Sequence, residues 1–207
     1  MHALVLANGT PPSPLLLERL YSESDLFLAA DGAANLLLSL DLPPHIILGD
    51  FDSLSDEARC QFVKSELVEA TDQEASDLDK ALSFLVERGA TQVTVTGALG
   101  GRIDHSLTNI SLLLKYGSSF DMRIVEDQGS LYLLRDRVDL EGAEGDTVSI
   151  VVFETVRGVN TEGLAWPLEN ATLHPGSRGV SNRLVGNRAT ITVHEGLAVV
   201  CQMSQPQ

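Results

Sequence analysis

In the first part of the chain, up to residue 122, short apolar runs alternate with amphipathic stretches. The apolar runs have the length of buried β-strands, and the stretches between them repeat their apolar residues at intervals of three and four, as helices do. Parallel strands need long crossover connections, so this alternation predicts an α/β domain with a parallel sheet. The expected strands are residues 3–7, 26–30, 46–49 and 92–96, and the expected helices are residues 15–20, 33–40 and 78–88.

From residue 123 to residue 207 the pattern changes to β-branched runs that are separated by glycines and have no helical period. This pattern predicts an all-β domain, so we place a domain boundary between residues 122 and 123. Glu195 and Gly196 separate the last two runs and predict a hairpin. The expected strands of this part are residues 123–125, 130–134, 147–152, 189–194 and 197–202.

Several aspartates directly follow the expected strands of the α/β part. Asp31 follows the second strand, Asp50 and Asp52 follow the third, and Arg102 and Asp104 follow the fourth after a glycine-rich loop. Ligands bind at the carboxyl ends of the strands in open α/β sheets, so these side chains should converge on one crevice. Neighbouring carboxylates repel one another unless a cation neutralises them, and Mg²⁺ prefers oxygen ligands. For Asp31, capping of the following helix is the other interpretation.

Residues 49–53, which read GDFDS, carry the sharpest signal. In an extended segment, alternate side chains project to the same side, so Asp50 and Asp52 can bind the same ion while Phe51 points into the fold. The alternative is an ordinary solvated turn, because Asp is common in turns. The position at the end of a buried strand favours ion binding.

The segment 71–80, which reads TDQEASDLDK, opens the third expected helix. Acidic residues at a helix start are stabilised by the helix dipole, and Ser76 with Asp79 three residues later resembles a capping box. Capping explains Asp79 better than it explains Gln73 or Asp77. For these two residues, a ligand-facing role and a purely structural role both stay open.

Residues 97–105, which read GALGGRIDH, combine three glycines with a guanidinium group and a carboxylate. Gly100 and Gly101 allow the backbone to approach phosphate oxygens closely, and Arg102 can bind such oxygens through two hydrogen bonds. The loop matches neither the Walker motif nor the dinucleotide-binding fingerprint. Combined with Asp104 at a strand end, it predicts a phosphate-binding loop of another kind. His105 is either a helix-start residue or a base.

Two features stand out in the all-β part. Trp166 is the only tryptophan of the chain, and Ser181 with Asn182 lies in a glycine-containing turn. Taken alone, Trp166 reads as a core residue and Ser181-Asn182 as an ordinary turn.

The charge balance narrows the possible partners. Lys and Arg total 14 against 29 Asp and Glu, for a formal net charge of −15. Nucleic-acid binding requires a basic surface, so we expect no nucleic-acid partner. Cys60 and Cys201 lack the spacing of a disulfide framework or a zinc site. The N-terminal apolar run is too short for a signal peptide and no later run reaches membrane-spanning length, so we expect a cytoplasmic protein without a membrane partner.

In combination, these motifs resemble the thiamine pyrophosphokinase family. They occur in the order of the family's motifs and at compatible spacing over nearly the whole chain. Two positions depart from the pattern: Arg183 follows Ser181-Asn182, and Ala33 replaces a glycine. The resemblance rests on residues 30–35, 49–53, 72–73, 76–77 and 100–105, on Gly163-Leu164 with Trp166 and Leu168, and on Ser181-Asn182.

The resemblance implies a Rossmann-like α/β domain that binds ATP, followed by a β-sandwich domain that binds thiamine, in a homodimer with thiamine between the subunits. The implied reaction moves the pyrophosphoryl group of ATP to the hydroxyethyl oxygen of thiamine, giving thiamine diphosphate and AMP. Mg²⁺ would be the cofactor, with ATP as co-substrate. The implied roles are catalysis for Asp50, Asp52, Asp77 and Asp104, with Mg²⁺ on the first three; nucleotide binding for Asp31, Gln73, Gly100, Gly101 and Arg102; and thiamine binding for Trp166, Ser181 and Asn182.

The physical chemistry of the residues agrees with this reaction. Attack on a phosphorus atom requires in-line geometry and charge neutralisation more than covalent help, and metal-bound carboxylates with one Arg supply both. Thiamine carries a permanent positive charge, which an acidic pocket attracts and a Trp ring can stack on. The group that removes the hydroxyl proton stays open between Asp77 and Asp104.

Two other functions fit part of the pattern. Residues 49–53 resemble the strand end of the aspartate-nucleophile phosphatases, but that family needs a later Lys and a further acidic pair, whereas this chain turns all-β. A non-catalytic sensor of nucleotide or thiamine is the second alternative. Retention of every metal-binding carboxylate argues against a sensor, since sensing does not require a full metal cluster.

Overall fold

The computed structural model describes residues 1–72 and 74–204, and the chain divides into two compact units, Met1–Asp127 and Gln128–Gln207. The expected boundary after residue 122 falls inside strand β6 (Asp121–Glu126), which pairs in parallel with β5 (Gln92–Thr96). The run 123–125, expected in the all-β part, therefore belongs to the first unit. A short apolar run looks the same in either kind of sheet, so only its partner strand decides where it belongs.

The first unit is a parallel sheet in the strand order β6-β5-β1-β2-β3-β4. Three of the four expected strands have the predicted bounds, and the first is shifted by one residue. The remaining strands are β1 (His2–Leu6), β2 (Leu26–Ala30), β3 (Ile46–Gly49) and β4 (Glu66–Glu69). The helices are α1 (Pro14–Ser22), the 3-10 helix η1 (Asp31–Ser39), α2 (Asp56–Gln61), α3 (Asp77–Glu87) and α4 (Ile103–Tyr116).

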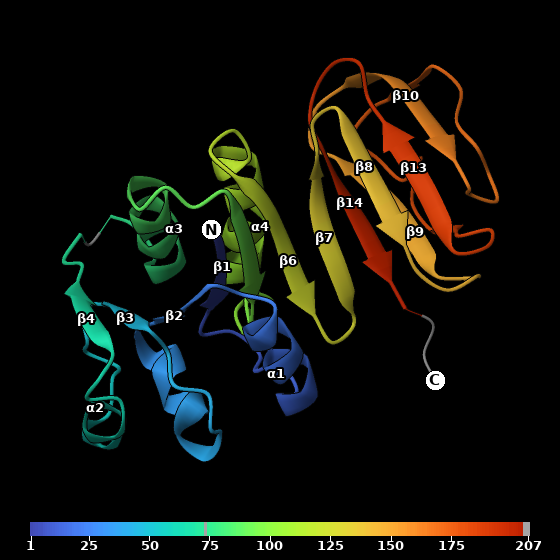
Figure 1. Cartoon of the computed structure of the whole chain (residues 1–207). Coiled ribbons are helices and arrows are strands. Elements are labelled where there is room, and N and C mark those ends of the chain that lie inside the picture. Colours follow the sequence, from blue (N-terminus) through green and yellow to red (C-terminus); the bar gives the residue numbers. More distant parts are fainter. Residues whose placement is uncertain (73, 205–207) are drawn as a thin grey trace. The chain divides into compact units, whose positions relative to one another are not determined.

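Helices cover both faces of this sheet (Figure 1). On one face, Leu4 and Leu6 of β1 and Phe27 of β2 share a core with Leu17 of α1 and Leu37 of η1. The side chains of successive strand residues point to opposite faces, so the residues between them face the helices on the other side. This two-sided burial explains why the strands read as continuous apolar runs.

The start of α3 is fixed by a cap and by a link to α4. The hydroxyl of Ser76 accepts a hydrogen bond from the Asp79 N–H at 3.3 Å. The carboxylate of Asp79 does not return to the cap; it accepts hydrogen bonds from Lys115 Nζ at 2.7 and 2.8 Å and from the Tyr116 hydroxyl. Of the expected capping box, the hydrogen bond to the Ser76 hydroxyl is therefore present, whereas the Asp79 side chain joins α3 to α4 instead.

The second unit consists of two antiparallel sheets, in the orders β12-β9-β14-β7 and β11-β10-β13-β8. Inward-facing residues of both sheets, among them Val138, Ile150, Ile191 and Val200, share one apolar core. The prediction of an all-β sandwich is therefore confirmed. The strands are β7 (Gly129–Leu134), β8 (Arg137–Glu141), β9 (Thr147–Val152), β10 (Val156–Glu162), β11 (Ala171–Leu173), β12 (Asn182–Arg183), β13 (Arg188–Thr192) and β14 (Ala198–Met203).

The predicted hairpin across Glu195-Gly196 is wrong. Strand β13 pairs with β8 and β10, whereas β14 pairs with β7 and β9 of the other sheet. The connection therefore crosses between the sheets, and Glu195 forms a bridge with Arg157 on the way. A local turn signal marks where a strand ends, but the choice of partner depends on burying both sheet faces against each other.

The two cysteines differ in environment. Cys60 is exposed, whereas Cys201 lies in β14 and burial raises the pKa of its thiol. Thiolates react with iodoacetamide and protonated thiols do not. We therefore expect iodoacetamide at pH 8 to modify Cys60 in the folded protein and Cys201 only after denaturation, as measured by mass spectrometry of the peptides. Equal labelling of both in the native protein would contradict this prediction.

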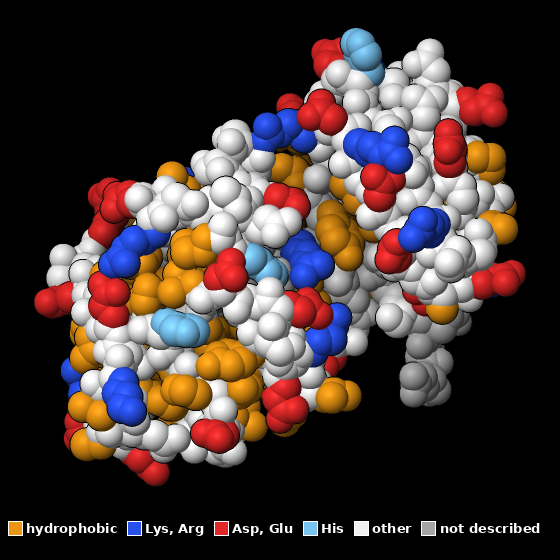
Figure 2. All heavy atoms as spheres, viewed as in Figure 1, with side chains coloured by type: hydrophobic (Ala, Val, Ile, Leu, Met, Phe, Trp, Pro, Cys, Tyr) orange, Lys and Arg blue, Asp and Glu red, His pale blue; other side chains and the backbone are white. Residues whose placement is uncertain are grey.

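The surface agrees with the charge balance. On the face shown in Figure 2, Lys and Arg side chains lie scattered among acidic ones. On this face the basic side chains do not form a continuous stripe. Among residues 1–72 and 74–204, no helix is both long enough and apolar enough to span a bilayer.

Candidate active site

A pocket of about 630 Å³ opens in the first unit, at the carboxyl ends of the strands. Strand β1 has β2 on one side and β5 on the other, so the chain reverses its direction across the sheet at β1. Ligands of open α/β sheets bind in the crevice at such a switch point. The lining includes Asn8 after β1, Asp50 after β3, Asp77 and Lys80 of α3, and Gly100 and Arg102 after β5.

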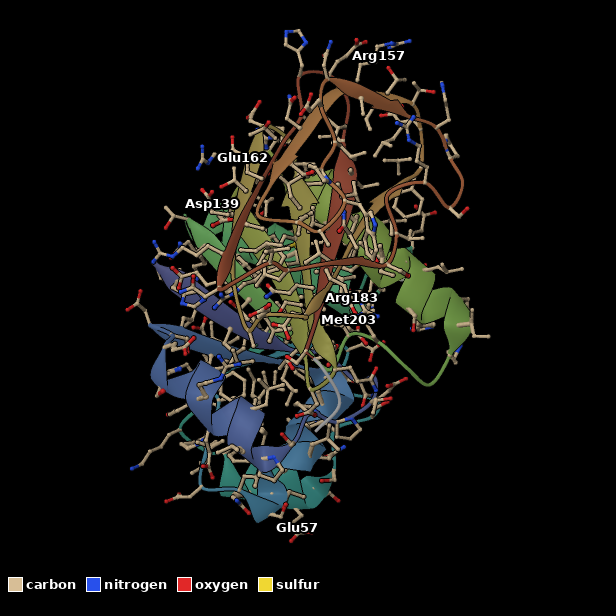
Figure 3. The ribbon with its side chains drawn as sticks, turned by 90° about the vertical axis from the view of Figure 1, so that its right-hand side faces the viewer. Glu57, Asp139, Arg157, Glu162, Arg183 and Met203 are labelled. Carbon is tan, nitrogen blue, oxygen red and sulfur yellow. The ribbon has the colours of Figure 1, made fainter. Side chains whose placement is uncertain are left out.

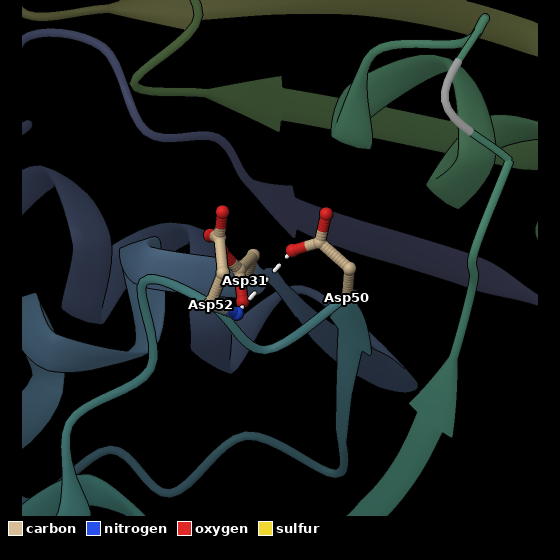
Figure 4. Close-up of side chains that lie close together, drawn as sticks. All are labelled: Asp31, Asp50 and Asp52. Carbon is tan, nitrogen blue, oxygen red and sulfur yellow. Dashed lines mark hydrogen bonds between the residues drawn. The ribbon is translucent and has the colours of Figure 1, made fainter.

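Three aspartates gather at this edge of the sheet (Figure 4). One carboxylate oxygen each from Asp31, Asp50 and Asp52 lies within 4.8 Å of the other two. Asp31 is 3% exposed, and among the described residues its Oδ1 has no hydrogen-bond partner. A buried oxygen without a partner beside two further carboxylates is a donor set that suits a hard divalent cation.

The electrostatics of Asp31 point the same way. Burial raises the pKa of Asp31, and the charges of Asp77 and Asp50 raise it further, against hydrogen bonds from the backbone of Ser53 and Gly32. A cation would reverse this balance, since it stabilises the ionised form. Asp31 is also the first residue of η1 with φ of 42°, and no side chain caps that helix. The site interpretation of Asp31 therefore agrees better with the structure than the helix cap.

The side chains of Asp50 and Asp52 lie close together, as expected, but the backbone between them turns instead of being extended. Phe51 has φ of 64°, so the chain turns there and the expected extended segment is wrong. The Asp52 N–H donates to Asp50 Oδ1 at 3.3 Å, and the Ser53 hydroxyl donates to Asp52 Oδ1 at 2.8 Å. Phe51 packs against the core as expected, with the Arg59 guanidinium 5.3 Å from its ring centre.

Two neighbours hold this turn against η1. Asn35 donates to the Ser53 carbonyl at 2.8 Å and accepts from the Ser55 N–H at 3.0 Å. Gly49 lies so close to Asp31 that a Cβ at Gly49 would stand 2.5 Å from the Asp31 Cβ. A glycine is therefore required at the end of β3 for the carboxylates to come together.

At the start of α3, Asp77 lies on the pocket wall with Lys80. The Lys80 ammonium is 3.2 Å from Asp77 Oδ1, and its side chain is only 8% exposed. Sequence reasoning missed Lys80, although a Lys three residues after Asp77 on one helix face was the available signal. Gln73, which was expected to face the ligand, lies outside the described residues.

The glycine-rich loop brings Gly100, Gly101 and Arg102 to the pocket. Both glycines have positive φ, 82° and 65°, which explains why glycine is needed there. Arg102 binds Asp104 through Nε and Nη2, at 3.1 and 2.5 Å, and these hydrogen bonds lower the pKa of Asp104 to about 2. A carboxylate with so low a pKa is a weak proton acceptor. His105 lies in the first turn of α4 and also lines the pocket.

In the second unit, Trp166, Ser181 and Asn182 come together. The Asn182 side chain donates to the Trp166 carbonyl at 2.6 Å and accepts from the Trp166 N–H at 3.0 Å. The Ser181 N–H donates to the Ser149 hydroxyl at 2.9 Å. Trp166 is 61% exposed, so its interpretation as a core residue is wrong. Arg183 follows on the edge strand β12 and is also exposed (Figure 3).

Two family models match the chain, each in one of its parts. The model described as thiamin pyrophosphokinase, catalytic domain, matches residues 17–126, and the model described as thiamin pyrophosphokinase, vitamin B1 binding domain, matches residues 136–198. The first match ends inside the first unit and the second begins inside the second unit.

Individual proteins agree with the family models. Thiamine pyrophosphokinase of Bacillus subtilis is 28% identical over 86% of this chain and 87% of its own length. Thiamine pyrophosphokinase 2 of Arabidopsis thaliana is 31% identical over 89% of this chain and 79% of its own. The crystal structure of thiamin pyrophosphokinase from Geobacillus thermodenitrificans has a TM-score of 0.86 and 29% identity, covering 100% of this chain and 99% of that one. The chain therefore belongs to the thiamine pyrophosphokinase family.

Proposed function

We propose that this chain transfers the pyrophosphoryl group of ATP to the hydroxyethyl oxygen of thiamine, releasing AMP and thiamine diphosphate. The observation that carries the proposal is the buried, unpartnered oxygen of Asp31 beside Asp50 and Asp52, next to a pocket that also holds Lys80 and Arg102. A cation-binding cluster beside two cationic side chains suits a metal-bound polyphosphate.

Mg²⁺ would be held by Asp50, Asp52 and Asp77. The oxygens of Asp50 and Asp52 lie together with one of Asp31, which would be a further donor, and Asp77 would reach the ion from the pocket wall. When bound, such an ion neutralises the charge that develops on the phosphate oxygens. The chain's own part is to hold the carboxylates at one point. The turn at Phe51 and the close approach of Gly49 to Asp31 do this.

The polyphosphate of ATP would lie along the glycine-rich loop, and Gln73 keeps its proposed role in nucleotide binding. The backbone at Gly100 and Gly101 lines the pocket, and Arg102 can exchange its hydrogen bonds with Asp104 for bonds to phosphate oxygens. Before ATP binds, Asp104 would orient Arg102 through these hydrogen bonds. Lys80 offers a second positive charge from α3.

The second unit supplies the thiamine-binding residues Trp166, Ser181 and Asn182. The exposed Trp166 ring is available to stack on a cationic heterocycle, and Asn182 fixes the backbone from which it projects. We place the thiamine between two subunits of a homodimer and the enzyme in the cytoplasm. The group that accepts the hydroxyl proton stays open between Asp77, which lines the pocket and pairs with Lys80, and Asp104, which pairs with Arg102.

One assay tests the reaction. The protein is incubated with ATP, Mg²⁺ and thiamine, and the products are separated by anion-exchange chromatography; we expect equal amounts of AMP and thiamine diphosphate, and none when EDTA is in excess. ADP or free phosphate in place of AMP would reject pyrophosphoryl transfer. A covalent phosphate on Asp50 would favour the phosphatase, and binding of ATP and thiamine without AMP formation would favour a sensor.

A further inference from the structure

Glu126, the last residue of β6, binds the glycine-rich loop from behind. Its carboxylate accepts hydrogen bonds from three consecutive backbone N–H groups, those of Gly97 at 3.1 Å, Ala98 at 2.8 Å and Leu99 at 3.1 Å. Successive N–H groups that converge on one point form an anion-binding concavity of the kind that often holds phosphate. In this chain the anion in the concavity is the protein's own carboxylate.

The carboxylate of Glu126 is costly to place there. Burial raises the pKa of Glu126 and the neighbouring charge of Asp127 raises it further, while the hydrogen bonds from residues 97–99 oppose both effects. Hydrogen bonds compensate the cost of taking a carboxylate partly out of water, so the contact with the loop offsets the partial burial of Glu126.

The rest of the loop is fixed from the other side. The Asn109 side chain donates to the Ala98 carbonyl at 2.7 Å, and the Gly100 N–H donates to the Ser106 hydroxyl at 3.1 Å. With the N–H groups of residues 97–99 engaged by Glu126, the loop presents Gly100, Gly101 and Arg102 to the pocket. The turn that leads into these three residues is thus bound by a residue from another strand.

We propose that Glu126 is a positioning residue for the nucleotide: its carboxylate anchors the turn at residues 97–99 and thereby aims Gly100, Gly101 and Arg102 at the ATP polyphosphate. The inference rests on the proposed function in that the loop binds ATP. A residue that only stabilised the fold would lower the melting temperature, but it would affect ATP and thiamine alike at temperatures where the protein is folded.

Glu126→Gln is the sharpest test, because the side chain keeps its size but presents an NH₂ group to one of the N–H donors. We expect the KM for ATP to rise about tenfold and the KM for thiamine to stay within about twofold. Glu126→Asp keeps the charge on a shorter stem and should recover part of the loss. Glu69→Gln is the matched control, since Glu69 also ends a parallel strand but is exposed, and it should leave both constants unchanged.

Calorimetric titration of MgATP into the wild type and the Gln variant separates this inference from the assignment of the reaction. If the wild type is active and the Gln variant has the same KM and Kd for ATP as the wild type, the positioning role is wrong but the assigned reaction stands. If the wild type forms no thiamine diphosphate, the reaction is wrong, but tenfold weaker MgATP binding by the variant still supports the positioning role. A wild type that does not bind MgATP overturns both. Should the Gln variant fail to fold, the Asp variant decides: an ATP-selective rise in KM supports the role and unchanged constants refute it.

Discussion

Asp50→Asn is expected to lower the rate of thiamine diphosphate formation about a thousandfold while the protein stays folded. Asp50 contributes a carboxylate oxygen within 4.8 Å of oxygens of Asp31 and Asp52, and an amide oxygen carries no net charge to bind Mg²⁺. The rate is measured under saturating ATP, Mg²⁺ and thiamine, and circular dichroism checks the fold.

The same substitution should stabilise the metal-free protein. The charge of Asp50 raises the pKa of the buried Asp31, so removing that charge relieves repulsion in the absence of a cation. We expect Mg²⁺ to raise the melting temperature of the wild type but hardly that of the variant. Asp41→Asn, at an exposed Asp outside the pocket, is the control and should behave like the wild type in both measurements. Near-normal activity of Asp50→Asn would remove Asp50 from the metal site.

Gly49→Ala is expected to lower the free energy of unfolding by about 1–3 kcal/mol. It should also reduce the activity at temperatures at which the variant is still folded. The added Cβ would stand 2.5 Å from the Asp31 Cβ and 3.1 Å from its Oδ1, so Asp31 must move away from its neighbours. No charge changes in this variant, so a loss of activity reports the position of the carboxylate. Urea denaturation gives the free energy of unfolding, and the steady-state assay gives the Mg²⁺ concentration for half-maximal rate, which should rise.

Gly89→Ala is the matched control. Gly89 has φ of 71° with open space around its Cα, so this variant should lose about 1 kcal/mol through backbone strain but keep normal Mg²⁺ dependence. Equal activity and Mg²⁺ dependence in Gly49→Ala and the wild type would show that the position of Asp31 does not matter for the reaction.

Local pattern was a good guide where burial is two-sided. The strands at residues 26–30 and 46–49 were predicted with their observed bounds, because both of their faces are covered and their sequences are apolar nearly throughout. The strand at residues 92–96 also has its predicted bounds, although it carries the buried polar residues Thr94 and Thr96. Strand β4 escaped prediction because it lies at the edge of the sheet and carries exposed Glu66 and Glu69. Helix α2 is a single short helix of mostly exposed residues, so it offered little periodicity to detect.

The acidic site, too, was predictable from the sequence only in part. The position of Asp31, Asp50 and Asp52 after strands was enough to predict that they converge, and their oxygens do converge. The turn at Phe51 and the need for glycine at residue 49 were not predictable, because both arise from contacts with η1. The spacing of Asp77 and Lys80 was visible in the sequence, but only the packing of α3 shows that the Lys80 side chain is buried.

The sequence by itself determined the two-part organisation, the apolar strands of the parallel sheet and the residues that follow them. Buried strands require apolar residues and turns require particular residue types, so both can be recognised from a short stretch of sequence. The tertiary structure decided which strands are partners, as with β6 beside β5 and with β13 and β14 in separate sheets. It also decided that the partly buried carboxylate of Glu126 meets the amides of residues 97–99. Such choices depend on contacts between residues far apart in the chain, where the gain from shared burial exceeds any local preference, and no stretch of sequence records them.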